Sequence, residues 1–207
     1  MLITPQSAID YVRQLPLDDP GRFSVVESWA RCRAAGLDPD GPAAVRRVSA
    51  SELRERRERH STLLEAAEPL VLALHGSLGG TTTVSYITDA AGIVLWSVGD
   101  PLQLAQFSLS PGFDWSEASM GTNGAGTALV TSRPVVVAGV QHFKTAFQNC
   151  TCTAAPIRGP DRRTIGAVDV SSSVEEARVD RIRLVALLAA EIEMELVRRE
   201  HGSSSSE

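Results

Sequence analysis

Apolar residues in the first third of the chain recur every three or four positions, the spacing of one face of an α-helix. The pattern predicts helices over about 5–15 and 24–35 and a longer one that begins at Ser49, where Ser49 and Glu52 have capping-box spacing. Pro69 is expected to kink or divide this long helix. Its heptad positions are continuously apolar only in the second half, at Leu64, Ala67, Val71 and Leu74.

The middle of the chain, about 82–171, alternates β-branched or aromatic runs with turn signals. The first two runs are joined by Ala90-Ala91-Gly92 and predict a hairpin, and a turn at 161–163 joins the last two. The predicted strands are 82–88, 93–96, 134–138, 152–157 and 164–170. Five short strands with a helical insertion predict an α+β domain with a largely antiparallel sheet.

The last part of the chain opens with Ser173 and Glu176, again at capping-box spacing. The helix predicted after them carries an apolar face made of Ile182, Val185, Ala189, Ile192 and Leu196. The organisation we expect is a helical region (1–79), a core domain (80–172), a C-terminal helix (173–200) and a flexible tail (201–207).

Composition narrows the class of protein without naming a function. The chain has 207 residues, of which 43% are apolar and 22% charged, and a net charge of −5, which argues against a protein that coats nucleic acid. It has no window of eighteen uncharged apolar residues and no signal-peptide pattern at its start, so we expect no membrane association and a cytoplasmic location. Three cysteines do not make a disulfide framework.

The most distinctive stretch is Pro111–Leu129, which contains a turn, a short helix, a glycine-spaced loop and a second helix start. Asp114 and Glu117 have capping-box spacing, and Thr122 or Asn123 is expected to cap a helix that runs to about Ser132. The glycine order is not that of a dinucleotide fold, and no P-loop lysine follows. The bare amides at this helix start suit a polar ligand, or the glycines simply let the helix pack closely on a sheet.

Four segments together resemble one family. They are Ser28-Trp29-Ala30-Arg31-Cys32 with Gly36–Pro39, the run Thr88–Leu95, the run Pro111–Leu129 with its Gly121-Thr122-Asn123-Gly124 core, and Gln141-His142-Phe143 with Cys152–Ile157 and Gly166–Ser171. In this order they resemble the N-terminal sensory region of acetoin- and glycerol-type activators of sigma-54-dependent transcription, whose sensor is a GAF domain. The resemblance covers roughly residues 24–172.

The resemblance implies a GAF-like antiparallel sheet of five or six strands, with N- and C-terminal helices packed on one face. It implies a small-molecule pocket on the other face, roofed by the segment 100–132, and a homodimer formed through the flanking helices. Full-length relatives carry an ATPase module and a DNA-binding helix-turn-helix. This chain has no Walker motif and no residues after Leu196 to build either module, so we expect neither ATP hydrolysis nor direct nucleic-acid binding by it.

Aromatic residues are the first candidates for the ligand pocket. Phe107 and Trp115, with Phe113, would form an aromatic roof over a ligand, or equally an ordinary core. Asn123 would orient a polar ligand with its amide, or simply cap a helix. His142 and its neighbour Phe143 follow a strand end and are further candidates for ligand contact.

No metal or other cofactor is expected, because the four histidines give no ligand spacing. Cys150 and Cys152 share one face of a predicted strand and permit a redox interpretation, or are small buried residues. Cys152 matches the family cysteine and is a candidate ligand contact. Asp89 and Asp169 are interpreted as turn or capping acids at strand ends.

Three functions remain open at this point. The first is a small-molecule-sensing GAF domain of a transcriptional regulator, which acts through ligand-dependent rearrangement of a helical dimer and signals to a missing module or a protein partner. The second is a cysteine-dependent GAF reductase of the free methionine sulfoxide type, for which Cys150 and Cys152 would supply the thiols. The third is a dimerisation scaffold without a ligand.

Overall fold

The computed structural model describes residues 23–41, 46–178 and 180–204. The helix predicted over 5–15 lies outside the described residues. Among those that are described, no helix has both the length and the apolar character that a bilayer crossing needs.

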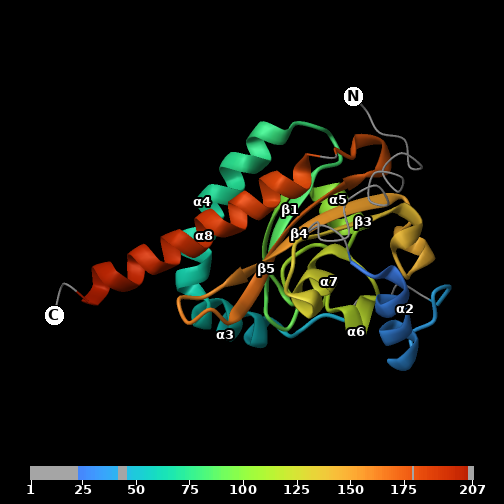
Figure 1. Cartoon of the computed structure of the whole chain (residues 1–207), viewed down its shortest axis with the longest axis horizontal. Coiled ribbons are helices and arrows are strands. Elements are labelled where there is room, and N and C mark those ends of the chain that lie inside the picture. Colours follow the sequence, from blue (N-terminus) through green and yellow to red (C-terminus); the bar gives the residue numbers. More distant parts are fainter. Residues whose placement is uncertain (1–22, 42–45, 179, 205–207) are drawn as a thin grey trace.

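The centre of the molecule is a five-stranded sheet in the order β2-β1-β5-β4-β3, in which every neighbouring pair is antiparallel (Figure 1). The strands are β1 (Val84–Asp89), β2 (Val94–Gly99), β3 (Val135–Ala138), β4 (Cys150–Arg158) and β5 (Thr164–Ser173). The predicted hairpin is β1–β2, and each of the other predicted strands is present. Because side chains alternate along a strand, Tyr86 and Ile87 point to opposite faces of the sheet.

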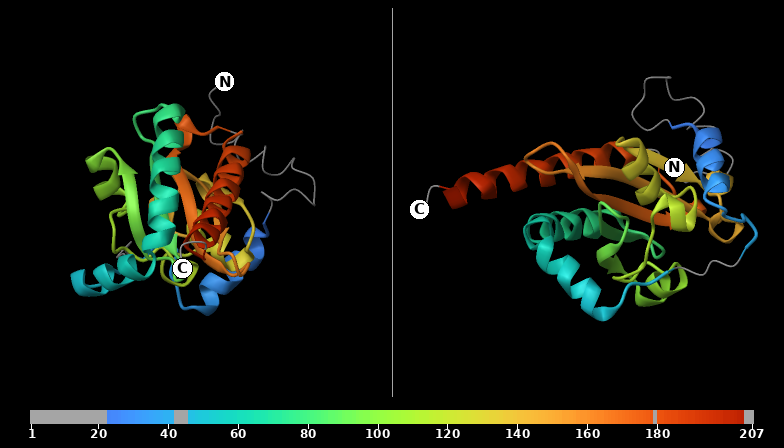
Figure 2. Two further views of the ribbon diagram at one scale, coloured as in Figure 1. Left: turned by 90° about the vertical axis from the view of Figure 1, so that its left-hand side faces the viewer. Right: turned by 90° about the horizontal axis from the view of Figure 1, so that it is seen from below.

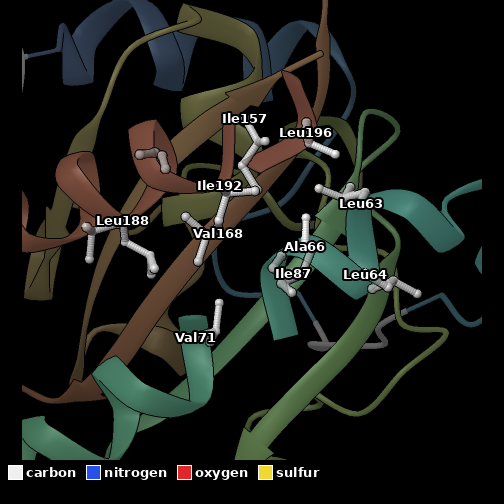
Figure 3. Packing of buried hydrophobic residues seen from close by; sticks show 14 of the residues in the cluster. Leu63, Leu64, Ala66, Val71, Ile87, Ile157, Val168, Leu188, Ile192 and Leu196 are labelled. Atoms are coloured by element: carbon white, nitrogen blue, oxygen red, sulfur yellow. The ribbon is translucent and has the colours of Figure 1, made fainter. Parts of the chain in front are cut away.

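One face of the sheet is covered by α4 (Ser61–Leu78) and α8 (Arg181–Ser204), which lie side by side across it (Figure 2). Apolar side chains of both helices meet those of β1, β4 and β5, as Ile87, Ile157 and Val168 show (Figure 3). All five residues of the predicted apolar face of the C-terminal helix are buried. The result is the α+β, GAF-like architecture that the sequence predicts, with N- and C-terminal helices on one face. Helix α8 continues to Ser204, past the predicted end at 200.

The long N-terminal helix is divided, but not at the proline. It ends as α3 (Ala50–Arg59), and α4 begins after His60, whereas Pro69 lies inside α4. Of the two alternatives for Pro69, division of the helix is therefore wrong, and a kink stays a prediction. Proline cannot donate a hydrogen bond to the carbonyl four residues earlier, which is that of Glu65. Arg199 of α8 donates to this carbonyl instead, at 3.4 Å, and ion-pairs with the Glu65 side chain.

The opposite face of the sheet is covered by shorter elements. They are α2 (Val25–Ala34), α5 (Pro101–Gln106), α6 (Glu117–Met120) and α7 (Gly124–Thr131), with 3-10 turns at Gly139–Gln141 and Thr145–Phe147. The segment from α5 to α7 is the helical insertion that the sequence predicts between the second and third strands. Side chains of this segment help to enclose the cavity described below, whereas side chains of α4 and α8 do not line it.

Two of the predicted capping boxes are not present. Ser116 caps α6 and accepts from the Ser119 amide, whereas Asp114 accepts from the Ser116 amide and the Ser119 hydroxyl. The acid of the second pair, Glu176, lies in a 3-10 turn (Val174–Glu176) whose start lacks a side-chain cap, and it binds Thr81 and Thr82 instead. In both pairs the second acid, Glu117 or Glu176, binds a residue about 90 positions away in the sequence. The box at Ser49 does cap α3, since Ser49 Oγ accepts from the Glu52 amide at 3.1 Å.

Candidate functional site

A small cavity lies between the sheet and the covering segments, on the face opposite α4 and α8. The side chains that line it come from β1, β4, β5, the segment after α5 and the loop before β4: Tyr86, Phe107, Leu109, Trp115, His142, Phe147, Cys150, Cys152, Ser171 and Ser172. The volume open to the centre of a water molecule is about 10 Å³. That is room for about one water, so a larger ligand requires the roof to move outward.

The roof of the cavity is aromatic. The rings of Trp115 and Phe147 are tilted against each other with centroids 5.0 Å apart, and the Trp115 indole donates to the Ser108 carbonyl at 2.8 Å. Phe107 and Leu109 complete it. The roof residues come from two segments, 107–115 and the 3-10 turn before β4, and backbone hydrogen bonds join the first of them to Gly92 and Val94.

The histidine of the cavity is fully engaged. His142 Nδ1 lies 3.0 Å from the Gly139 carbonyl, and Nε2 lies 3.3 Å from the Cys152 thiol. The first contact requires a proton on Nδ1, which leaves Nε2 to accept from the thiol. Burial lowers the pKa of His142 to about 4, so the ring is neutral near pH 7.

The two neighbouring cysteines are free thiols. Burial raises the pKa of Cys150 to about 12 and that of Cys152 well above its ordinary value, and the Asp169 carboxyl nearby acts in the same direction. Because the thiolate is the nucleophile, both residues are unreactive in this state. The arrangement does not favour a cysteine-dependent reductase.

Asp169 is not at a strand end, and its interpretation as a turn acid is wrong. It lies within β5, fully buried, in register with Tyr86 of β1. Its Oδ1 accepts from the Ser171 hydroxyl at 2.6 Å, whereas Oδ2 has no hydrogen-bond partner among the described residues. Burial raises the pKa of Asp169 to about 7, and the nearby Ser171 and Tyr86 hydroxyls and the Ala125 amide oppose that rise. Asp89 does act as a turn acid, since its Oδ1 accepts from the amides of Ala91 and Ile93.

The glycine-spaced motif places α7 directly against this carboxyl group. A Cβ on Gly124 would collide with Asp169 Oδ2, and one on Gly126 would lie 2.5 Å from the Glu117 amide nitrogen. Asn123 Oδ1 accepts from the Gly126 amide at 2.8 Å, and its Nδ2 donates to the Gly121 carbonyl at 2.8 Å. The predicted cap is confirmed, and the glycines allow close packing.

A second polar cluster joins the Ser28–Cys32 segment to the glycine-spaced motif. Glu117 of α6 is buried and accepts hydrogen bonds from Ser28, Thr127 and Arg31, at 2.7, 2.9 and 2.6 Å. Ser28 Oγ also lies 2.6 Å from Thr122 Oγ1. This Glu117 cluster docks α2 onto α6 and α7, so two of the motifs that carry the family resemblance are in direct contact.

Four of the six predicted site residues line the cavity, namely Phe107, Trp115, His142 and Cys152. Asn123 lies at the start of α7, and Phe143 packs edge-on against Trp29 with ring centroids 5.5 Å apart; neither lines the cavity. Their predicted role in ligand contact stays a prediction. Sequence reasoning missed Tyr86, Leu109, Phe147, Ser171 and Ser172 as lining residues. Ser171 was detectable, because polar and apolar residues alternate from Val168 to Ser171 along a core strand.

Nothing in the described chain gathers three or more His, Cys, Asp or Glu side chains into a metal-binding group. A solved structure with a closely similar fold is the DhaR(N)–DhaL complex of E. coli, with a TM-score of 0.83 and 19% identity over 88% of this chain and 63% of that one. At this identity the likeness concerns the fold alone.

Several sequence relatives are transcriptional activators. The chain is 30% identical over 178 residues to the acetoin dehydrogenase operon transcriptional activator AcoR of Bacillus subtilis, which covers 84% of this chain and 29% of that protein. It is 31% identical over 159 residues to the propane 2-monooxygenase operon transcriptional activator MimR of Mycolicibacterium smegmatis, covering 74% and 26%. The chain spans less than a third of the length of each. Residues 16–195 match the family model "MimR, N-terminal domain", and the chain belongs to this family.

Proposed function

We propose that this chain is the small-molecule-sensing region of a cytoplasmic transcriptional regulator, with regulation and not catalysis as its role. The observation that carries the proposal is the closed aromatic cavity on the face of the sheet opposite α4 and α8, lined by side chains from five separate segments. Concave, mostly apolar sites with a few polar groups are the usual form of a small-molecule site. The regulatory role of the relatives supports the same interpretation.

Adjacent serines give a route from the cavity to the helices. Ser171 donates to Asp169, and the next residue, Ser172, accepts from Arg181 Nη1 at 2.6 Å. Arg181 is the first residue of α8, so a shift of this end of β5 also moves the start of that helix. Glu176 binds Thr81 and Thr82 just after α4, which ties the second helix to the same end of the sheet.

The two long helices are the proposed dimer surface. They carry apolar side chains that remain exposed in the described chain, among them Leu72, Leu184, Leu187 and Met194. Leu187 is 67% exposed. A ligand that prefers one arrangement of the paired helices shifts the dimer by its difference in affinity for the two arrangements. The output is an additional module or a separate protein, just as DhaR(N) forms a complex with DhaL, and no direct contact of this chain with nucleic acid is proposed.

Native mass spectrometry of the purified chain, followed by a thermal-stability screen of uncharged metabolites, tests the proposal. A retained or added ligand should raise the melting temperature, because it binds the folded state alone. Trp115→Ala, which removes part of the roof, should abolish that shift, whereas Trp96→Ala on the far side of the sheet should not. If no compound raises the melting temperature and the chain still forms a dimer, the nearly filled cavity favours the scaffold function instead.

A further inference from the structure

A buried guanidinium group lies where the sheet meets α8. Arg181, the first residue of that helix, is 3% exposed. Its Nη1 donates to the Ser172 hydroxyl at 2.6 Å, and its Nη2 donates to the Glu176 carbonyl at 3.2 Å. Both acceptors are uncharged, and none of the ion pairs within the described part of the chain includes Arg181. A buried charge is normally paired, so this one lacks its usual counter-charge.

The acids nearby in the sequence do not supply that counter-charge. The Glu176 carboxylate accepts hydrogen bonds from the amides and hydroxyls of Thr81 and Thr82 instead. Asp180 is exposed, and the exposed Arg178 adds a positive charge. The positive end of the α8 dipole lies here as well. The local field therefore favours an anion.

Two polar atoms beside the guanidinium carbons have no hydrogen-bond partner among the described residues. They are Arg181 Nε and Thr151 Oγ1, and Thr151 is 4% exposed. Thr151 of β4 is in register with Ser172 of β5, so their side chains are neighbours on the sheet. Because the Ser172 hydroxyl also holds Arg181, the three side chains form one group. An acceptor that reaches both unpaired atoms would remove the cost of burying them.

We propose that Arg181 and Thr151 bind one monatomic anion, a halide such as chloride, at the start of α8. The ion supplies the missing counter-charge and accepts hydrogen bonds from Arg181 Nε and from the Thr151 hydroxyl. The deep burial of both side chains favours a bare ion over a larger oxyanion. Neither residue lines the cavity, so this site goes beyond the proposed function and does not depend on it.

A buried water molecule is the alternative occupant. Water can accept from Arg181 Nε and donate to Thr151, as buried waters do for polar groups that lack partners. It brings no charge, however, and leaves the guanidinium without a counter-ion. The two occupants therefore differ in one measurable respect, which is the dependence of stability on the kind of anion in solution.

Thermal melts of the full chain in sodium chloride and in sodium gluconate, each at about 0.2 M, test this dependence, because the two salts screen charges equally. An ion that binds the folded state alone raises the melting temperature. We expect the wild type to melt about 3 °C higher in chloride. Equal melting temperatures in the two salts would overturn the proposal.

Thr151→Val separates specific binding from general salt effects. In gluconate it should leave the melting temperature unchanged or raise it, because it removes a buried hydroxyl that has no partner. In chloride it should lower the melting temperature, because the ion loses a donor. Thr88→Val is the matched control, since it removes another buried unpaired hydroxyl, on β1, and should act equally in both salts. An equal effect of Thr151→Val in both salts would contradict the proposal.

Arg181→Met removes the charge, keeps most of the side-chain volume and should remove the preference for chloride. Arg183→Met, at an exposed position of the same helix, should keep it. If Arg181→Met does not fold, the Thr151→Val comparison still decides. Sulfate should stabilise the wild type and Thr151→Val by the same amount, because it acts through general exclusion from the surface. A rise specific to the wild type would show that the site takes oxyanions and would overturn the monatomic class.

Anomalous diffraction from crystals of the full chain grown in sodium bromide locates the ion directly. We expect a bromide peak within hydrogen-bonding distance of Arg181 Nε and Thr151 Oγ1. Density without an anomalous signal at that point would identify water as the occupant and overturn the inference.

Discussion

Among the buried carboxyl groups of the described residues, Glu117 and Asp169 have different surroundings. Glu117, 4% exposed, accepts hydrogen bonds from Ser28, Thr127 and Arg31. Asp169, 0% exposed, accepts one from Ser171, and its second oxygen has no partner in the described chain. Both belong to segments that carry the family resemblance, so sequence similarity alone does not separate their roles.

This difference distinguishes a cluster that fixes the packing of the fold, around Glu117, from a candidate site, around Asp169. Where every bond of a buried acid is supplied by the protein, the acid fixes the packing of the elements around it. Where a buried polar atom has no hydrogen-bond partner among the described residues, as at Asp169 Oδ2 and the Tyr86 hydroxyl, packing alone does not explain the group. The Glu117 cluster therefore holds α2 in place, and the Asp169 cluster is the functional candidate.

Replacing the fully bonded acid gives the largest expected effect. Glu117→Ala should lower the free energy of unfolding by roughly 3 kcal/mol, because it leaves buried hydroxyls and a guanidinium without their acceptor. Glu58→Ala, an exposed acid on α3, should change it by less than about 0.5 kcal/mol. Urea denaturation at fixed protein concentration measures both. A loss of under about 1 kcal/mol for Glu117→Ala would remove the contrast between the clusters.

The next effect tests how closely α7 is packed on Asp169. Gly124→Ala should cost about 2 kcal/mol, because its Cβ meets Asp169 Oδ2 and lies 2.8 Å from Cys152 Cβ. Gly76→Ala is the control, since it lies in α4 with open space around the added Cβ and should stabilise by up to about 1 kcal/mol. Thermal melts of the two variants measure this. A change in melting temperature of the same sign for both would contradict the close approach of α7 to Asp169.

The pH dependence of stability should report on Asp169. Its pKa is raised to about 7 by burial, so its contribution to stability is greatest below about pH 4 and is lost as the pH rises through 7, by at most about 1.4 kcal/mol per unit. The pKa of His142 is lowered to about 4, so its contribution has the opposite sign and is lost as the pH falls from about 6.5 to 4. The two trends oppose each other in the wild type.

Asp169→Asn should therefore expose the His142 trend. The difference in melting temperature between the variant and the wild type should grow in favour of the variant from pH 4.5 to about 7 and then level off. Parallel curves for the two proteins would show that Asp169 does not change its charge in this range.

The smallest expected effect concerns local opening around the two clusters. Buried cysteines near each of them can report on it. Cys32 contacts Thr122 in the Glu117 cluster, at 3.7 Å, and Cys150 and Cys152 line the cavity. If the aromatic roof opens more easily than α2 detaches, iodoacetamide should label Cys150 and Cys152 severalfold faster than Cys32. Peptide mass spectrometry of timed samples measures this. Labelling of Cys32 first, or of all three thiols together, would contradict it.

Local patterns predicted most of the fold correctly. The apolar face Ile182–Leu196, the hairpin of β1 and β2 and the Asn123 cap all depend on residues a few positions apart, and all are present. The hydrogen-bond partners of the acidic residues were less predictable, because each acid has possible partners both nearby in the sequence and far from it. Glu117 and Glu176 both have capping-box spacing, and both bind groups about 90 residues away.

The candidate site was predicted in part for the same reason. The sequence motifs and the aromatic residues near them point to Phe107, Trp115, His142 and Cys152. Tyr86 lies on β1, outside those motifs. The sequence places Asp169 at a strand end because the predicted strand stops at 170, whereas β5 continues to Ser173. Its true place follows from pairing with β1 and β4, which no local pattern specifies.

The sequence by itself determined the α+β class, the helices that cover one face and the family to which the chain belongs, because periodicity and short motifs carry that information. The tertiary structure alone decided which buried acid is satisfied and which is not. Hydrogen-bond partners are set by side-chain positions across the sheet, and the free energy of a buried polar group depends on those partners and not on its neighbours in the chain.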